Sequence, residues 1–319
     1  IINNTAGYGG GIYALGTGPL AEVLIGAKVI ISNNTARYSG GGVYIDQLEM
    51  AMREPDSAIA FNTAQGQSDS GYSGGLTIRA AARDAYAYIG TSGFGSSGAI
   101  FGNQARYGGG VAVVGGDSTV YSSSVLQVFT TDATRPGSIR DNFATVAGGG
   151  VFVAGYDDDL NGSVSSDAQF YNARLDDNSA PRGAAAFTNS YGRIYFNERN
   201  LPAGALACQP GLVCGGIVGN EARDTSGPVN GAVIELVDGY FSVGSDSQTG
   251  GVEIRGNRGG RLLSKSNDAY GGFENALITH NTVSLDLFSA SDDDDFSIAD
   301  STITDNTIGA PHVIWGDNI

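Results

Sequence analysis

Short apolar stretches recur along the whole chain and are separated by turn residues. Each stretch holds about four residues in which apolar and polar positions tend to alternate, as in Ala21–Ile25, Ala85–Ile89 and Tyr240–Val243. A period of two places successive side chains on opposite faces of a strand, whereas an amphipathic helix needs apolar residues three and four apart. The pattern therefore predicts short β-strands rather than helices.

A four-residue motif, Ile-x-x-Asn, occurs ten times. Its first residue is Ile in every copy except one, which has Leu175, and Ala follows the Asn by two residues in seven copies. A motif repeated at this spacing is the signature of a fold built from stacked units, so it decides the architecture. The Asn residues of the ten copies are Asn4, Asn34, Asn62, Asn103, Asn142, Asn178, Asn220, Asn257, Asn281 and Asn306.

A run of glycines follows most copies of the motif, as in Gly40-Gly-Gly-Val-Tyr44. A third apolar stretch lies between these glycines and the next Asn, so each repeat offers three short strands. The spacing of successive Asn residues ranges from 24 residues (Asn257 to Asn281) to 42 residues (Asn178 to Asn220). Uneven spacing suits coils whose turns accept insertions.

These features predict an all-β fold, a right-handed parallel β-helix of about ten coils, each with three short strands and with loops inserted at the turns. We expect residues 1–319 to form a single β-helix domain. The sequence opens and stops within a repeat and shows no initiator Met or signal peptide. We therefore expect a fragment, or the ordered part, of a longer secreted protein.

The motif residues suit the corners of such a coil. Asn tolerates the left-handed backbone that a sharp bend requires, and stacked Asn side chains can hydrogen-bond from coil to coil. The Ile three residues earlier should point into the interior, and the glycines should serve the opposite corner, where a Cβ would clash. The ten Asn residues are thus predicted to form a structural ladder.

The pairing of Gly-Gly-Gly-Val or Gly-Gly-Gly-Ile with Ile-x-x-Asn resembles the repeats of chlamydial polymorphic outer membrane proteins and related autotransporter passengers. Those repeats carry Gly-Gly-Ala-Ile and Phe-x-x-Asn, so this chain differs in having Ile where the family favours Phe. The resemblance spans nearly the whole chain. It implies a secreted β-helix that is exposed on a bacterial surface and used in adhesion.

The net charge of −16 narrows the classes of partner that the chain could bind. Such an acidic chain lacks the basic patch of a nucleic-acid binder and would be repelled by anionic lipid. The longest apolar runs, such as Val29–Ile31, fall far short of the ~20 residues of a membrane span. We expect no nucleic-acid partner, no membrane insertion within this segment, and a location outside the cell or on the bacterial surface.

One acidic segment has the spacing of a calcium loop. Asp157, Asp159 and Asn161 alternate before Gly162, and Asp167 lies ten residues after the first Asp. Alternate oxygen ligands and a Gly at the tight turn suit Ca²⁺. The twelfth position lacks the usual Glu, so a solvated acidic turn is the favoured alternative. Calcium is the one candidate ion, and no cofactor is expected to be required.

The two cysteines, Cys208 and Cys214, bracket a short loop. A disulfide between them would suit a secreted protein and is favoured over two free buried thiols.

Tyrosines precede several of the glycine corners and would stack along one edge of the coil. They could form a platform for sugars, although packing over the corner glycines is the favoured alternative. The residues are Tyr8, Tyr38, Tyr72 and Tyr107.

No residue is assigned a catalytic role, and the sequence favours a non-enzymatic protein. We expect a surface-exposed or secreted bacterial β-helix that serves as an adhesin passenger or structural stalk, with a glycan or a host or cell-surface protein as candidate partner. One alternative is a carbohydrate-active β-helix, a polysaccharide lyase or glycoside hydrolase. Another is an extracellular fibre subunit that self-associates through the ends of its β-helix. Function should lie in the inserted loops, chiefly between Asn62 and Asn257.

Overall fold

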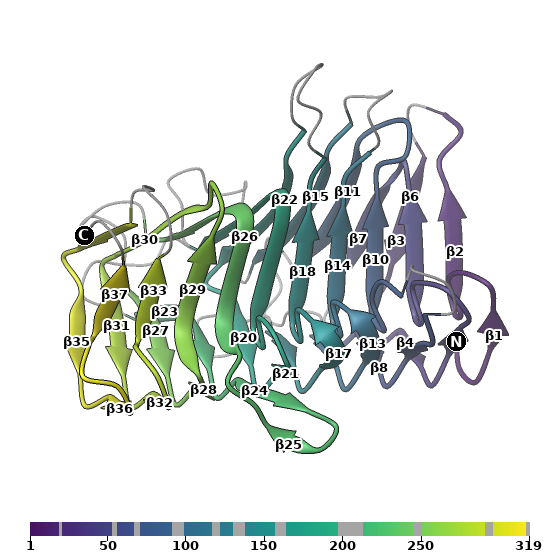
Figure 1. The fold of residues 1–319 in the computed structure, drawn as a ribbon. Helices are drawn as coiled ribbons and strands as arrows, with labels where there is room; N and C mark the ends of the chain where they lie inside the picture. The colour runs from purple at the N-terminus through teal and green to yellow at the C-terminus, as the bar shows by residue number, and fades with distance from the viewer. Residues whose placement is uncertain are drawn as a thin grey trace.

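The repeats stack as coils of a parallel β-helix. The computed structural model describes residues 1–18, 21–52, 56–66, 71–90, 99–116, 122–129, 138–156, 164–196, 213–244, 251–290 and 296–316. Within these ranges the regular structure consists of β-strands, and no helix is present. Strands of successive repeats pair in parallel, so the coils follow one another from the N-terminal to the C-terminal end of the stack (Figure 1). The predicted fold class is confirmed.

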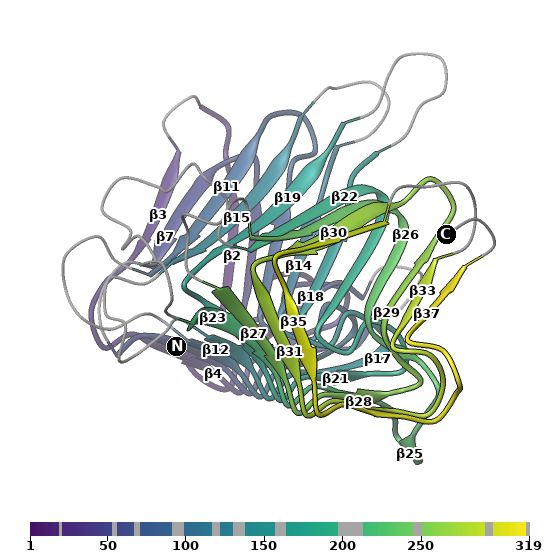
Figure 2. The same cartoon turned by 90° about the vertical axis from the view of Figure 1, so that its left-hand side faces the viewer.

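Figure 2 looks along the stack and shows how three sheets enclose the interior. The nine-stranded sheet contains the first residue of nine of the ten motif copies, from Ile31 to Ile303. Its strands are β4 (Ile30–Ser32), β8 (Ala58–Ala60), β12 (Ala99–Phe101), β16 (Ser138–Arg140), β20 (Arg174–Asp176), β23 (Val213–Val218), β27 (Gly251–Arg255), β31 (Ala276–Thr279) and β35 (Thr302–Thr304).

The eleven-stranded sheet follows the Asn corner and consists mostly of very short strands. One short antiparallel hairpin, β24 with β25, projects out of the stack (Figure 1). The strands are β1 (Thr5–Ala6), β5 (Thr35–Ala36), β9 (Thr63–Ala64), β13 (Gln104–Tyr107), β17 (Phe143–Ala147), β21 (Ser179–Ala180), β24 (Glu221–Asp224), β25 (Gly227–Pro228), β28 (Arg258–Gly259), β32 (Thr282–Val283) and β36 (Thr307–Ile308).

The seventeen-stranded sheet is bent and contains two ladders of parallel strands. The first ladder begins at the glycine corner. Its strands are β2 (Ile12–Leu15), β6 (Val43–Asp46), β10 (Leu76–Arg79), β14 (Val111–Val114), β18 (Val151–Ala154), β22 (Ala186–Phe196), β26 (Ala232–Val243), β29 (Arg261–Ser266), β33 (Phe288–Ala290) and β37 (Ile314–Gly316).

The second ladder lies beyond the bend of that sheet. It shares the long strands β22 and β26 with the first ladder, because each of these runs through the bend without interruption. Its other strands are β3 (Glu22–Ile25), β7 (Glu49–Met52), β11 (Ala85–Ile89), β15 (Ser124–Phe129), β19 (Ser166–Tyr171), β30 (Tyr270–Glu274) and β34 (Phe296–Ala299).

Apolar side chains from the three sheets form one continuous core along the stack. The Ile of one repeat pairs in register with that of the next, as Ile31 does with Ile59 and Ile59 with Ile100. All three are fully buried. Farther along the stack Phe170 and Phe196 lie with ring centroids 4.7 Å apart. Each such side chain contributes roughly 1.5–3 kcal/mol relative to exposure.

The ten Asn side chains form an unbroken ladder at the corner between the nine-stranded and eleven-stranded sheets. Asn142 is typical. Its Nδ2 donates to Oδ1 of Asn178 at 3.0 Å and to the carbonyl of Ile100 at 3.1 Å, while its own Oδ1 accepts from the backbone N–H and Nδ2 of Asn103, both at 3.0 Å. The same amide-to-amide bond joins each of the nine successive pairs.

The left-handed residue at this corner is the one before the ladder Asn, which differs from the expectation that the Asn itself would bend the chain. Asp141 has φ of 55° and Asp177 has φ of 51°, and the remaining copies follow the same rule. The ladder Asn keeps φ negative because its amide must lie over the next coil. One residue therefore makes the bend, and the Asn that follows it makes the ladder hydrogen bonds.

The glycine corner lies at the other end of the short strand that follows the Asn. In Gly40-Gly-Gly42 the first residue has φ of 69°, which favours glycine. The other two leave no space for a Cβ. One at Gly42 would lie 2.8 Å from Nδ2 of Asn62 and 2.9 Å from the carbonyl oxygen of Gly75. The two sequence motifs are thus in direct contact, since glycine makes room for the Asn ladder.

Candidate functional site

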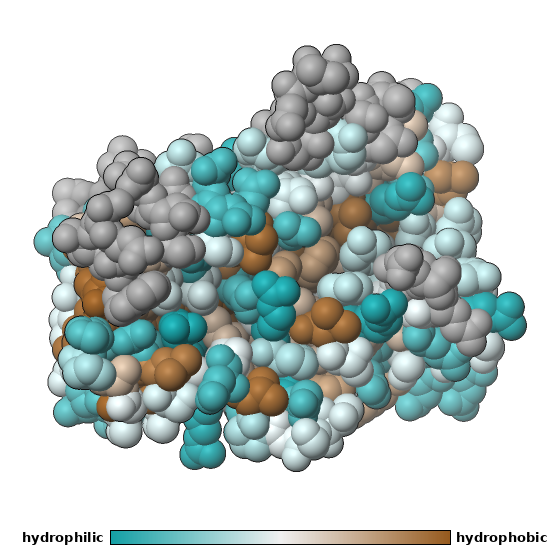
Figure 3. All heavy atoms as spheres, viewed as in Figure 1, coloured by the Kyte–Doolittle hydropathy of each residue, from teal (hydrophilic) through white to brown (hydrophobic). Residues whose placement is uncertain are grey.

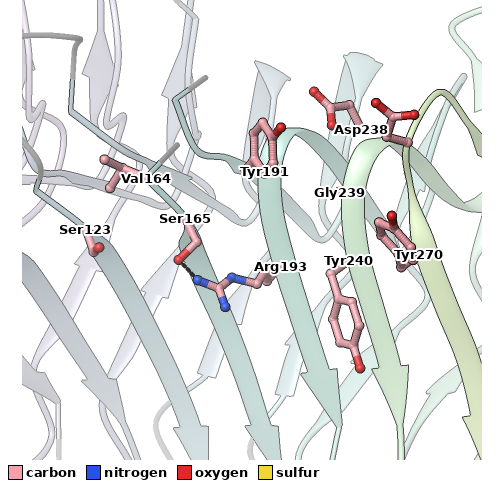
Figure 4. A pocket seen from close by; sticks show the side chains of 10 residues that line it. Ser123, Val164, Ser165, Tyr191, Arg193, Asp238, Gly239, Tyr240 and Tyr270 are labelled. Carbon is pink, nitrogen blue, oxygen red and sulfur yellow. Dashed lines mark hydrogen bonds between the residues drawn. The ribbon is translucent and has the colours of Figure 1, made fainter. Parts of the chain in front are cut away.

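A groove lies on the outer face of the second ladder. Its volume is about 530 Å³. We call it the tyrosine groove. The residues that line it are Tyr191, Arg193, Asp238, Tyr240, Asp268 and Tyr270, with Ser123, Val164, Ser165 and Gly239 (Figure 4).

Strand register explains why these residues meet. Arg193 on β22 pairs with Tyr240 on β26, and Tyr240 pairs with Tyr270 on β30, so the three form one row across neighbouring strands. Parallel strands lie ~4.8 Å apart, so the row extends roughly 10 Å. Alternation within each strand turns these side chains outward, because the neighbouring Ile194 and Phe241 point into the core and are fully buried.

The bend of the seventeen-stranded sheet places two more side chains at the edge of the groove. Tyr191 has φ of 62° and Asp238 has φ of 53°. Each precedes a glycine that has no room for a side chain: a Cβ at Gly239 would lie 2.4 Å from Oγ1 of Thr188. Figure 4 shows Tyr191 and Asp238 where the two strands turn, above Arg193 and Tyr240.

Arg193 is held in place by three neighbours. Its Nε forms an ion pair with Asp167, in which Nε lies 3.1 Å from Oδ1. Its Nη1 donates a hydrogen bond to the Tyr195 hydroxyl at 3.4 Å. Its Nη2 donates a hydrogen bond to Oγ of Ser165 (Figure 4). The guanidinium side chain still keeps 41% of its surface exposed. It can therefore present a fixed donor to a ligand in the groove.

Burial raises the pKa of Asp167 above the ordinary 3.8, and the attraction of Arg193 offsets only part of that rise. An Asp with a higher pKa in the folded chain binds its proton more tightly there, so its contribution to stability falls as pH rises from 3.8 through the folded-state pKa. Asp167→Asn should therefore gain stability relative to the wild type across that window. Urea midpoints of both proteins between about pH 3 and pH 7 measure the effect, and a constant difference would contradict it.

Of the four residues of the predicted calcium loop, the structure describes Asp167. Asp157, Asp159 and Asn161 lie outside the described residues, so calcium binding there stays a prediction. Asp167 lies on β19 and faces Arg193. Within the described ranges, no three His, Cys, Asp or Glu side chains come together in a way that could hold a metal ion.

Two further predictions have different outcomes. Cys208 lies outside the described residues, as does the side chain of Cys214, so their disulfide stays a prediction.

The tyrosines at the glycine corners do stack in part. Tyr8 and Tyr38 lie 5.0 Å apart, whereas Tyr72 and Tyr107 pack with Phe152 in an outer hydrophobic cluster.

The first-ladder face carries hydrophobic residues in separate spots among hydrophilic ones (Figure 3). The sequence pattern does not reveal the tyrosine groove on the second ladder, because the residues of the groove are spread over more than 140 positions, from Ser123 to Tyr270. The available signal was the outward-facing tyrosines of the third apolar stretch, such as Tyr240. Most of the groove does lie between Asn62 and Asn257, although it is built from strands and bends.

The fold defines a class, an elongated β-helical repeat protein. Residues 28–46 match the family model of the Chlamydia polymorphic membrane protein repeat. This stretch contains the first fully buried Ile, the Asn34 corner and the Gly40-Gly-Gly42 corner. The match indicates a bacterial surface protein of the outer-membrane or autotransporter type.

No match was found among curated proteins, and no solved structure matches the chain. In the described part of the chain there is no helix with the length and hydrophobicity to cross a membrane.

Proposed function

We propose that this chain is a surface-exposed or secreted, non-enzymatic bacterial β-helix that acts as an adhesin passenger, with the tyrosine groove as its binding face. The observation that supports adhesion is the groove itself. Tyr270 and Tyr191 keep 49% and 38% of their surface exposed beside the fixed Arg193. Exposed tyrosines that are held by rigid strands are typical of recognition surfaces, because they offer large contact area at little entropic cost.

The remaining architecture suits presentation of that face. The Asn ladder and the core continue through all ten coils, so the groove is carried on a rigid rod. Adhesion needs such stiffness, since a preorganised surface loses little entropy when it binds. A structural stalk would need the rod but not the groove.

Beads coated with the purified chain test adhesion to cultured epithelial cells. Wild-type beads should adhere, and beads that carry Tyr240→Ala with Tyr270→Ala should lose at least four-fifths of that adhesion, roughly 1 kcal/mol of binding. Tyr13→Ala is the matched control, because Tyr13 is 53% exposed and lies on β2, far along the stack from the groove. Equal adhesion of all three proteins would reject the groove as the adhesive face. A wild type that adheres to no cell would favour the stalk.

One observation supports a carbohydrate-active enzyme as the second candidate. Asp238 and Asp268 both line the groove, and paired carboxylates are the usual catalytic groups of glycoside hydrolases. Polysaccharide cleavage that disappears in Asp238→Asn and in Asp268→Asn would favour this candidate over adhesion.

A further inference from the structure

We infer that the ligand of the tyrosine groove is an uncharged oligosaccharide. This inference rests on the adhesive face proposed above and specifies the chemistry that it recognises. Tyrosine rings and polar groups are combined there in a way that suits sugar rings, which have apolar C–H faces and hydroxyl edges.

The tyrosines supply the surfaces on which sugar rings can stack. The ring of Tyr240 packs beside that of Tyr195, which is not one of the lining residues, with centroids 5.3 Å apart and a tilt of 43°. Tyr270 adds a second ring to the groove on the adjacent strand, in register with Tyr240. Aromatic rings combine an apolar face with a polar hydroxyl, so they can contact both parts of a sugar.

A second hollow continues the groove and sets the length of the ligand. It has a volume of about 270 Å³ and shares Tyr240 and Tyr270 with the first. It exists because small residues, Ser242, Gly272 and Ser297, occupy the outer face beside those tyrosines. At Gly272 a Cβ would lie 2.4 Å from Oγ of Ser297. Two hollows that share two tyrosines accommodate a chain of more than one sugar unit.

Charge decides between neutral and acidic sugars. Asp238 and Asp268 line the first hollow and Glu274 the second, whereas Arg193 is the one basic residue among the described residues that line either of them. Arg193 is already paired with Asp167. The chain as a whole carries a net charge of −16. An anionic polysaccharide would meet repulsion at the groove and at long range, so the favoured ligand carries no charge.

The sheet disfavours a peptide as the ligand. Recognition of an extended peptide commonly adds a strand to a free sheet edge. The strands below the groove have neighbours on both sides, because β22 pairs with β19 and β26, and β26 pairs with β22 and β30. Backbone groups are thus already used, and side chains alone must hold the ligand.

Isothermal titration calorimetry with defined probes tests the inference. The probes are hexasaccharides of glucose, mannose, galactose and N-acetylglucosamine, with hexagalacturonate as the charged counterpart of the galactose chain and oligolysine as a cationic peptide. At least one uncharged hexasaccharide should bind more tightly than its disaccharide, and hexagalacturonate should not bind. Tyr240→Ala and Tyr270→Ala should each weaken binding about tenfold, whereas Tyr13→Ala should leave it unchanged. Circular dichroism checks that each variant is folded.

Three results would overturn the inference: no uncharged hexasaccharide binds, binding does not respond to the groove tyrosines, or only hexagalacturonate or oligolysine binds. The bead experiment keeps the two proposals apart. If beads adhere through the groove but no uncharged saccharide binds, the adhesive role stands and the ligand class is wrong. If a saccharide binds at the groove but beads do not adhere, the ligand class stands and the adhesive role is wrong.

Discussion

Replacing Asn142 with Leu should lower the free energy of unfolding by about 2–6 kcal/mol. Asn142 is fully buried, and its side chain makes four hydrogen bonds within the ladder. Leucine can make none of them. The backbone N–H and Nδ2 of Asn103 would lose their acceptor inside the protein, and each unsatisfied buried group costs about 1–3 kcal/mol. Urea unfolding followed by circular dichroism measures the loss.

The matched control for this prediction is Thr145→Leu, in the same coil. Thr145 lies on β17 with its side chain exposed, so the same new residue should change stability by no more than about 0.5 kcal/mol. An unchanged urea midpoint for Asn142→Leu would show that the ladder does not stabilise the rod.

The second large effect is expected from Gly110→Ala, at the glycine corner. An added Cβ would lie 2.6 Å from Cγ2 of Ile139, 2.7 Å from the carbonyl oxygen of Gly150 and 2.8 Å from Nδ2 of Asn142. Because backbone and ladder surround the site, relief requires the coils to move apart or the Asn142 amide to leave its partners. We expect a loss of about 2–4 kcal/mol in the free energy of unfolding, measured by urea denaturation.

Gly26→Ala separates this steric effect from the general effect of removing a glycine. A Cβ at Gly26 meets no atom within 4 Å. Its substitution should be neutral or should stabilise the chain by up to about 1 kcal/mol, because alanine restricts the unfolded chain. Equal losses for Gly110→Ala and Gly26→Ala would contradict the packing explanation.

These two sites show why the fold could be predicted from sequence. An Ile or Leu and an Asn recur at the separation of Ile139 and Asn142 in every repeat, and each stacks on the equivalent residue of the next coil. A local pattern of this kind specifies a residue's neighbours across coils, because the partner is always the equivalent position of the next repeat. Gly110 could be placed at a corner by the same argument, although its contact with Asn142 could not.

The tyrosine groove could not be predicted in the same way. Tyr240 and Tyr270 stand on the third strand of their coils, where the sequence does not repeat. Insertions of different length separate these strands, so sequence spacing gives no register between them. The positive φ values of Tyr191 and Asp238 arise from the bend of β22 and β26, two long strands that replace the usual pair of short ones.

The sequence by itself determined the coil, its corners and its buried column, because those depend on contacts between identical positions of successive repeats. Tertiary structure alone decided which outer side chains meet. It placed Arg193 beside Tyr240 and paired it with Asp167, and it assigned the left-handed bend to the residue before each ladder Asn. The physical reason is that outward-facing residues gain their neighbours from strand register, and in this chain variable insertions separate the strands whose register forms the groove.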